Sequence, residues 1–211
     1  MFPDEEAAFQ GNQRVAVVRR LLVGFCAREG MRKENAVTLQ WSDLAFHGNG
    51  EVMISLDKTK NGRGGSWVLD PGTGEALRRW RTICPSKKFV FPASALPQHR
   101  ESDDWPMYVD HLADQLRDGL RQAGVTREKL FERSPNRIRL RAHDLRATFV
   151  TLALGPHEKT EAWVATRTGH RSSQMIALYW RQAKTAVELR LTWLRPLHEI
   201  IPELARLIKS A

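Results

Sequence analysis

The 211-residue sequence predicts a mainly α-helical domain that carries a small antiparallel β-sheet, an α+β fold. Three observations support this prediction. Apolar residues recur at helical spacing over most of the chain, one alternating run between glycine-rich turns interrupts them, and no linker is long enough to divide the chain. Because 42% hydrophobic and 27% charged residues are ordinary for a globular core, we expect a single domain over residues 1–211.

The first predicted helix spans residues 12–28, with its apolar residues on one face and Arg20 and Arg28 elsewhere. A second, short helix restarts after Gly30 in "EGMRKENAVTLQWSDL" and ends near Trp41. The two segments therefore predict consecutive helices at the start of the domain.

The sheet is predicted where the apolar period changes from helical to alternating. A turn at residues 47–50 precedes an alternating run at residues 52–56, a second glycine-rich turn follows, and residues 67–69 read as a further strand. We therefore expect about three antiparallel strands in this region.

Helices resume after the sheet and continue to the end of the chain. Residues 71–83 and 105–124 are the next two predicted helices, and Gly124 is the expected stop of the second. Further helices are predicted at residues 143–155, 157–169 and 172–184, followed by a C-terminal helical tail within residues 186–211.

The charge of the chain favours a polyanionic partner, with nucleic acid as the leading candidate. The sequence has 33 Lys and Arg against 24 Asp and Glu, a net charge of +9. The excess is densest in "RSPNRIRLRAHDLR", where five arginines from Arg133 to Arg146 accompany one acid, Asp144. An ordinary solvated basic face is the alternative interpretation of this cluster.

Cysteine usage and hydropathy exclude several classes of protein. Cys26 and Cys84 lack the spacing of a disulfide framework or a zinc site, so no metal and no cofactor is expected. No apolar run approaches the roughly 20 residues of a membrane span, and the N-terminus has no apolar secretory region. We expect a cytoplasmic protein without a membrane partner, in which Cys26 is a core residue, Trp41 and Trp180 are core or helix-packing residues, and Tyr108 is structural.

A set of side chains matches what breaking a DNA strand requires. Two guanidinium groups can neutralise the charge that grows on a phosphodiester under attack, and a general acid must protonate the departing oxygen. A tyrosine can form the covalent intermediate if nearby cations offset its pKa of about 10. The candidates are Arg32 in "GMRKENAVTLQW", Lys60 in "KTKNGRGG", His143 and Arg146 in "HDLR", His170 in "TGH", and Tyr179.

These short sequence motifs, in this order, resemble those of the tyrosine recombinase (phage integrase) family over roughly residues 10–185. The family pattern is an arginine after a helix-opening glycine, a hairpin lysine, HxxR, GH, and a tyrosine nine residues further on, as Tyr179 follows His170 here. The resemblance implies the fold of the family's catalytic domain. It also implies a site-specific recombinase that cleaves and rejoins DNA through a 3′-phosphotyrosyl intermediate, without metal or ATP.

The resemblance also implies a role for each candidate residue. Tyr179 would be the nucleophile, and Arg32 and Arg146 would bind the scissile phosphate. His143 would act as the base-side histidine, and His170 would hydrogen-bond the phosphate or orient the site. All five roles concern one phosphorus atom, so the side chains are expected to converge in space.

Two positions leave the assignment of roles open. Lys60 would protonate the leaving 5′ oxygen, but Lys58 stands on the same face of a strand and is the alternative. The family usually has a carboxylate three residues after its first arginine, where this sequence has Asn35, with Glu34 beside it. A missing carboxylate would leave Arg32 less firmly oriented.

The implied partner is a double-stranded DNA recombination site, on which the protein would self-associate as a tetramer. The apolar tail at residues 197–208 either covers the protein's own core or docks into a neighbouring subunit. About a dozen residues precede the first predicted helix, so the family's N-terminal core-binding domain is expected to be absent.

Two other functions remain open from the sequence. A non-catalytic DNA-binding protein on a decayed recombinase scaffold would keep the basic face, and Asn35 motivates this alternative. Strand relaxation of the type IB topoisomerase kind would use the same tyrosyl chemistry without strand exchange.

Overall fold

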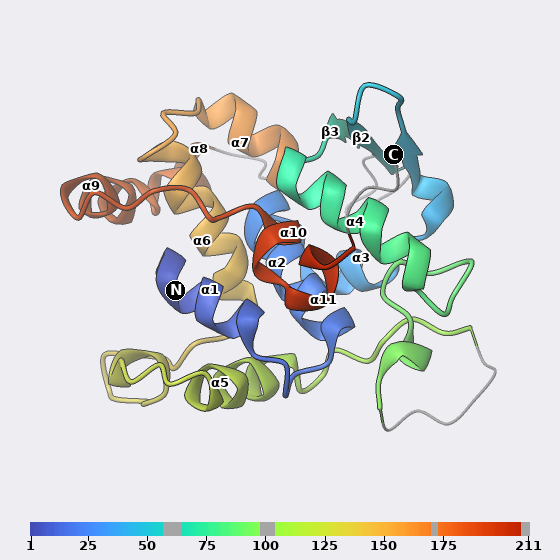
Figure 1. The fold of residues 1–211 in the computed structure, drawn as a ribbon. Helices are drawn as coiled ribbons and strands as arrows, with labels where there is room; N and C mark the ends of the chain where they lie inside the picture. Colours follow the sequence, from blue (N-terminus) through green and yellow to red (C-terminus); the bar gives the residue numbers. More distant parts are fainter. Residues whose placement is uncertain (57–64, 98–103, 170–172, 208–211) are drawn as a thin grey trace.

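The computed structural model describes residues 1–56, 65–97, 104–169 and 173–207, and confirms a mainly helical fold with one small sheet (Figure 1). The strands are β1 (Leu44–Phe46), β2 (Val52–Leu56) and β3 (Gly65–Val68). The helices are α1 (Pro3–Gly11), α2 (Val17–Glu29), α3 (Lys33–Val37), α4 (Pro71–Ile83), α5 (Leu112–Gln122), α6 (His143–Leu154), α7 (Glu161–Thr168), α8 (Ser173–Ala177), α9 (Trp180–Glu188), α10 (Leu197–Ile200) and α11 (Pro202–Ala205). Short 3-10 turns are η1 (Trp41–Asp43), η2 (Ala93–Ala95) and η3 (Glu128–Leu130).

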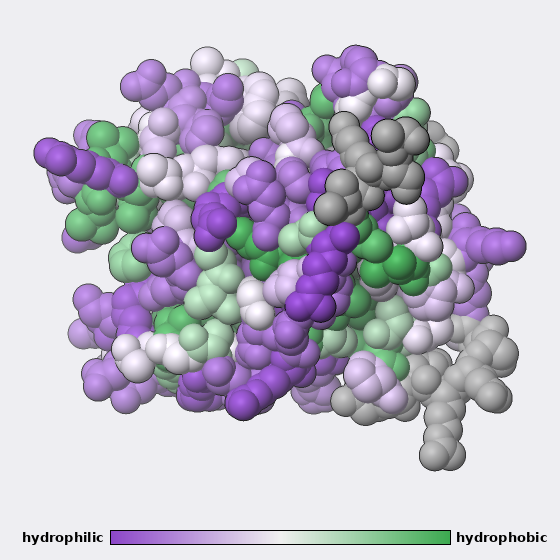
Figure 2. Space-filling model, in the orientation of Figure 1, coloured by the Kyte–Doolittle hydropathy of each residue, from purple (hydrophilic) through white to green (hydrophobic). Residues whose placement is uncertain are grey.

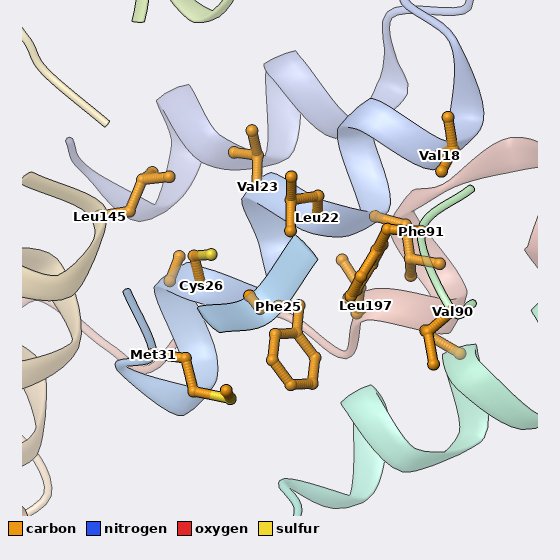
Figure 3. Packing of buried hydrophobic residues seen from close by; sticks show 14 of the residues in the cluster. Val18, Leu22, Val23, Phe25, Cys26, Met31, Val90, Phe91, Leu145 and Leu197 are labelled. Atoms are coloured by element: carbon orange, nitrogen blue, oxygen red, sulfur yellow. The ribbon is translucent and has the colours of Figure 1, made fainter. Parts of the chain in front are cut away.

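Helix α2 forms the centre of the main hydrophobic core (Figure 3). Leu22 and Phe25 are fully buried, and the Phe25 ring meets Phe91 edge-on with the ring centroids 5.6 Å apart. Leu145 of α6 and Leu197 of α10 belong to the same cluster. A helix that is buried on all sides is expected at the centre of a domain, whereas the sequence pattern had predicted a single apolar face.

Two arginines of α2 are buried and form ion pairs with helices near the two ends of the described chain. Arg28 pairs with Glu6 of α1 (Nη1–Oε1 2.9 Å, Nη2–Oε2 3.0 Å), and Arg20 pairs with Glu203 of α11 (Nη2–Oε1 2.5 Å). The prediction that these arginines lie outside the core was wrong, and α1 was not predicted. The reason is that the partners of Arg28 and Arg20 lie 22 and 183 residues away, beyond the reach of helical periodicity.

The sheet has the strand order β1-β2-β3, with both pairs antiparallel, as predicted. Ile54 of the central strand is paired with Leu44 on one side and Trp67 on the other. Because side chains alternate between the two faces of a strand, this register buries Ile54 and exposes its neighbour Ser55. Residues 57–64, which join β2 to β3, lie outside the described residues.

Helix α4 has the predicted bounds, whereas α5 begins later than predicted. The Asp70 side chain accepts a hydrogen bond from the Thr73 amide (3.0 Å) and Pro71 occupies the first turn, which are strong start signals for α4. The predicted start of α5 at residue 105 was wrong. Residues 105–107 are extended and bond to residues 91–93 (Met107 N to Phe91 O 2.8 Å), as the residue before a proline favours.

The helix predicted at residues 172–184 is two helices. Helix α8 ends at Ala177 and α9 begins at Trp180, so Tyr179 lies at their junction, with its amide bonded to the Ile176 carbonyl (2.9 Å). Ile176 is buried in a second cluster with Phe149 and Val150 of α6, and Ala183 of α9 is buried in the same cluster. The break allows both short helices to bury residues against α6, and it places Tyr179 between them.

The C-terminal segment packs on the protein's own core. Leu197, Ile201 and Leu204 are fully buried, and Arg79 of α4 donates to the Leu204 carbonyl (3.0 Å). Figure 1 shows α10 and α11 lying across α2 and beside α4. Of the two interpretations of the tail, covering its own core is therefore observed for residues 197–204, and docking into another subunit stays a prediction.

Other predictions for single residues have mixed outcomes. Cys26 and Trp41 are buried as expected, at 1% and 5% exposure. Trp180 is 37% exposed and donates to Glu161 of α7 (2.7 Å), so of the two expectations it joins two helices and does not lie in the core. Tyr108 is 73% exposed. Hydrophilic side chains are spread over the face seen in Figure 2. Among the described helices, none is long and apolar enough to cross a membrane.

Candidate active site

Three of the predicted site residues line one small pocket. Arg32 at the start of α3, and His143 and Arg146 in the first turns of α6, line it together with Glu34 and a few neighbours, and its cavity volume is about 40 Å³. Arg32 and Arg146 are 114 positions apart in the sequence, so the fold brings two cationic side chains to one place. A larger groove of about 570 Å³ between α6 and α9 contains none of the candidate residues.

Arg146 is held by main-chain oxygens from two other helices. Its Nη1 donates to the Gly30 carbonyl (2.7 Å), and its Nη2 donates to the Thr168 carbonyl. These carbonyls belong to the C-terminal ends of α2 and α7, where the helix dipole favours a cation. The side chain is 3% exposed.

The charge on Arg146 survives this burial. Burial, and then repulsion from Arg32, lower the pKa of Arg146 to about 10, so the guanidinium is still protonated at neutral pH. A cation held in a place of low polarity interacts strongly with any anion that reaches it. The pocket is thus suited to a phosphate group.

Gly30 lies in the turn between α2 and α3, two residues before Arg32. It adopts the left-handed conformation (φ 67°) at the end of α2, and its amide bonds to the Cys26 carbonyl (3.1 Å). A Cβ atom at this position would overlap the ring of Phe149. Glycine is therefore required both by the backbone conformation and by the close approach of α6.

Arg32 and its neighbours form the rim of the pocket opposite α6. Arg32 is half-buried and caps α3, with its carbonyl accepting from the Asn35 amide (3.0 Å). Glu34 lines the pocket, and its carboxylate pairs with Lys33 (3.3 Å). A carboxylate is thus present at the pocket one position before Asn35.

His143 is the first residue of α6 and is exposed at the pocket. Partial burial, and then the positive charge of Arg146, lower the pKa of His143 below its usual value of about 6.5. At neutral pH the imidazole is therefore mainly uncharged and can accept a proton.

Tyr179 is half-buried at the α8–α9 junction and packs against the Phe149 cluster. Burial and Arg32 lower the pKa of Arg146, and an ionised Tyr179 phenol raises it. The hydrogen bond to Asp144 is the main cause of the raised pKa of Arg141, to which an ionised Tyr179 also contributes. The phenol is thus near the pocket and is not sealed in the interior.

Arginines in the segment that precedes α6 form an exposed basic surface. Arg133, Arg137 and Arg139 are exposed, and Arg141 is exposed and bonds to Asp144 (2.9 Å). Such a surface attracts polyanions over distances longer than those of direct contacts.

Two predicted site residues lie outside the described residues. These are Lys60, with its alternative Lys58, in residues 57–64, and His170 in residues 170–172. Their predicted roles are unaffected by the geometry above.

Glu29 is a buried residue near the pocket that sequence reasoning missed. Its Oε2 accepts from Trp67 Nε1 (3.0 Å) and Arg167 Nη1 (3.2 Å), and its Oε1 accepts from the Asp70 amide (2.9 Å). Burial raises the pKa of this fully buried carboxyl to about 7. The one available signal was an acid next to the glycine that precedes Arg32.

The solved structures that this chain resembles share its fold. The chain spans about half the length of the XerH recombinase chains that it matches. The XerH site-specific recombinase, in a post-cleavage complex with palindromic difH substrate, matches with TM-score 0.63 and 21% identity over 90% of this chain and 51% of that chain. A lambda integrase dimer bound to a COC′ core site matches with TM-score 0.60 and 14% identity over 87% and 59%. The catalytic domain of bacteriophage HP1 integrase matches with TM-score 0.54 and 14% identity over 89% and 90%.

At these identities the structural likeness shows the fold alone, and no curated protein matches the sequence. The sequence itself, however, matches the profile described as the Phage integrase family over residues 6–186, which is most of the chain. The chain therefore belongs to the phage integrase family.

Proposed function

We propose that this chain is the catalytic domain of a tyrosine-type site-specific recombinase that cleaves DNA by attack of Tyr179 on a backbone phosphate. The observation that carries the proposal is that Arg32, His143 and Arg146 line one pocket, with Tyr179 near enough for its ionised phenol to raise the pKa of Arg146. Family membership supports the same conclusion.

The first step forms one bond and breaks another at phosphorus. The Tyr179 oxygen attacks and becomes bonded as a 3′-phosphotyrosyl ester, while the 5′ oxygen leaves. Arg32 and Arg146 stabilise the charge that grows on the non-bridging oxygens, because forked guanidinium donors match the phosphate geometry. His143, mainly neutral at pH 7, would accept the phenolic proton.

Lys60 and His170 complete the proposed chemistry by analogy with the family. Lys60, or Lys58 in its place, gives a proton to the leaving 5′ oxygen, and His170 hydrogen-bonds the phosphate. Rejoining is the reverse reaction, in which a 5′ hydroxyl of another strand attacks the phosphotyrosyl ester. One phosphoester is exchanged for another at every step, so the proposed reaction needs no ATP. In the proposal Arg32 and Arg146 provide the positive charge at the phosphate without a metal ion.

The proposed partner is a double-stranded DNA recombination site. The exposed arginines before α6, including Arg133, Arg137 and Arg139, support this partner, because phosphate contacts dominate the affinity of proteins for DNA. Similarity to XerH bound to difH and to a lambda integrase dimer on its core site also supports it. We propose that the protein works in the cytoplasm and self-associates on paired sites as a tetramer.

A covalent adduct tests the proposal. The purified chain is incubated in EDTA with a pool of radiolabelled, nicked duplexes of randomised central sequence, and the products are separated on a denaturing gel. The expected result is a protein–DNA adduct that is lost in Tyr179→Phe and kept in Tyr108→Phe. Tyr108 is a matched control because it is the other tyrosine of the chain and is 73% exposed.

The competing functions give different outcomes in the same assay. Binding to DNA that weakens with salt, but without any adduct, would favour a non-catalytic protein, the alternative that Asn35 motivates. An adduct accompanied by relaxation of supercoiled DNA, without exchange between duplexes, would favour a topoisomerase.

A further inference from the structure

The C-terminal ends of α2 and α7 are joined twice, through consecutive residues. Glu29 bonds to Arg167 (3.2 Å), and the next residues of each helix, Gly30 and Thr168, both accept from the guanidinium of Arg146. The ion pair and the Arg146 guanidinium therefore span the same gap between the two helices. Any change in the spacing of these helix ends moves the two carbonyls that orient Arg146.

Glu29 also connects the C-terminal ends of α2 and α7 to strand β3. Its two oxygens accept from Trp67 of β3 and from the Asp70 amide at the start of α4, so one carboxylate joins four elements. Arg167 lies between two indole rings, 4.7 Å from the Trp163 centroid and 5.7 Å from the Trp67 centroid. The rings and the carboxylate together leave Arg167 little freedom.

We propose that Glu29 is a positioning residue for Arg146, acting through Arg167 to fix the spacing of the α2 and α7 ends whose carbonyls orient the Arg146 guanidinium. The catalytic consequence of this inference rests on the proposed recombinase function. The geometric consequence, the ordering of Arg146, does not.

Because the charge of Glu29 changes near neutral pH, the pH dependence of cleavage tests the proposal. Burial raises its pKa to about 7, above the ordinary 4.5, against the lowering effects of the Asp70 amide, Arg167 and Trp67. The charged groups that face it are Arg167 from α7 and Asp70 at the start of α4. Below pH 7 the protonated carboxyl no longer pairs with the Arg167 cation, so cleavage is expected to fall as the pH falls through about 7.

The same protonation has the opposite effect on folding stability. Because the folded-state pKa is the higher one, the folded protein binds a proton between pH 4.5 and about 7 that the unfolded chain releases. The contribution of Glu29 to stability therefore falls as the pH rises through this window, while cleavage rises. A merely structural residue would move both quantities in the same direction.

The pair formed by Glu6 and Arg28 provides a matched control. Both of its side chains are fully buried, and Arg28 is the residue next to Glu29 on α2. It joins α1 to α2, however, and does not bridge the helix ends that hold Arg146. Loss of this ion pair should weaken folding without changing the pH dependence of cleavage.

The experiment compares single-turnover cleavage by the wild-type chain, Glu29→Gln, Arg167→Met, the double variant and Glu6→Gln, using the nicked duplex that gives the adduct. Glu29→Gln and Arg167→Met should each lower the cleavage rate on the order of 10²-fold at pH 8 with DNA affinity unchanged. The double variant should be no slower than either, because both changes break one link. Glu29→Gln should also lose the rise in rate near pH 7, which Glu6→Gln should keep.

A second measurement does not depend on activity. In protein labelled with ¹⁵N-arginine, the Arg146 guanidinium, identified by its loss in Arg146→Lys, should exchange its protons about tenfold faster or more in Glu29→Gln than in wild type. It should be unchanged in Glu6→Gln. An absent adduct with wild type would refute the proposed function alone, and this measurement would still decide the positioning role.

The proposal is overturned by either of two results. One is a Glu29→Gln variant with the pH profile and rate of the wild type. The other is an Arg146 guanidinium whose exchange is the same in wild type and Glu29→Gln.

Discussion

Two buried arginines in this protein, Arg28 and Arg146, are held in different ways. Arg28 meets the two carboxylate oxygens of Glu6, so its charge is cancelled by an acid at 2.9 and 3.0 Å. Arg146 donates to the neutral carbonyls of Gly30 and Thr168, and its pKa is lowered by burial and then by a neighbouring cation, Arg32. The first arrangement cancels the charge within the fold, whereas the second leaves a positive charge that, on the proposed function, meets an incoming phosphate.

The largest expected effect is on folding, from the arginine whose charge is cancelled. Arg28→Met should lower the free energy of unfolding by about 3–5 kcal/mol, because Glu6 would be left as a buried charge without its partner. Urea unfolding at constant pH measures this loss. Cleavage per folded molecule should be unchanged, and a proportional loss of cleavage rate would mean that the two arginines are not functionally distinct.

Arg146→Ala should have the complementary effect. Removing a charge-assisted contact to the phosphate should raise the barrier to cleavage by about 3 kcal/mol or more, which is over a hundredfold in rate. The adduct assay with wild type as reference gives the rate. Cleavage at the wild-type rate would show that Arg146 is not part of the phosphate clamp.

Gly30→Ala should affect folding and cleavage together, since Gly30 both packs against α6 and presents a carbonyl to Arg146. A side chain at φ 67° against the Phe149 ring should cost about 2 kcal/mol of stability. Thermal and urea unfolding, beside single-turnover cleavage, test this expectation. If stability falls and the cleavage rate of the folded fraction is unchanged, the Gly30 carbonyl does not position Arg146.

The smallest effect is expected at the exposed arginines of the segment before α6. Arg137→Gln should reduce the slope of log affinity against log salt by about 1 and leave cleavage in the saturated complex unchanged. DNA binding measured over a series of KCl concentrations gives the slope. An unchanged slope would place Arg137 away from the DNA.

The sequence predicted the parts of this fold that depend on local signals. The bounds of α4 follow from Asp70 and Pro71, and the three strands follow from alternation between glycine-rich turns. The start of α5 was wrong because pairing of residues 105–107 with residues 91–93 overrides a helical pattern. The break at Tyr179 was missed because it depends on packing against α6.

In the candidate site, too, the residues that could be predicted from the sequence are those that stand in local motifs. Arg32, His143 and Arg146 stand in short motifs, so they could be named from the sequence, and the structure places them around one pocket. Glu29 could not be named, because its meaning depends on Arg167, which lies 138 residues away. A side chain that acts through a distant partner carries no motif of its own.

The main-chain carbonyls around Arg146 also determine when this side chain would become ready for the proposed cleavage. Because the two carbonyls belong to helices of the folded core, the guanidinium acquires its orientation when the chain folds and not when the nucleic acid arrives. Little rearrangement of this group is then needed at the moment of strand cleavage, so the speed of that step should depend mainly on how the scissile bond and the phenol are brought into line.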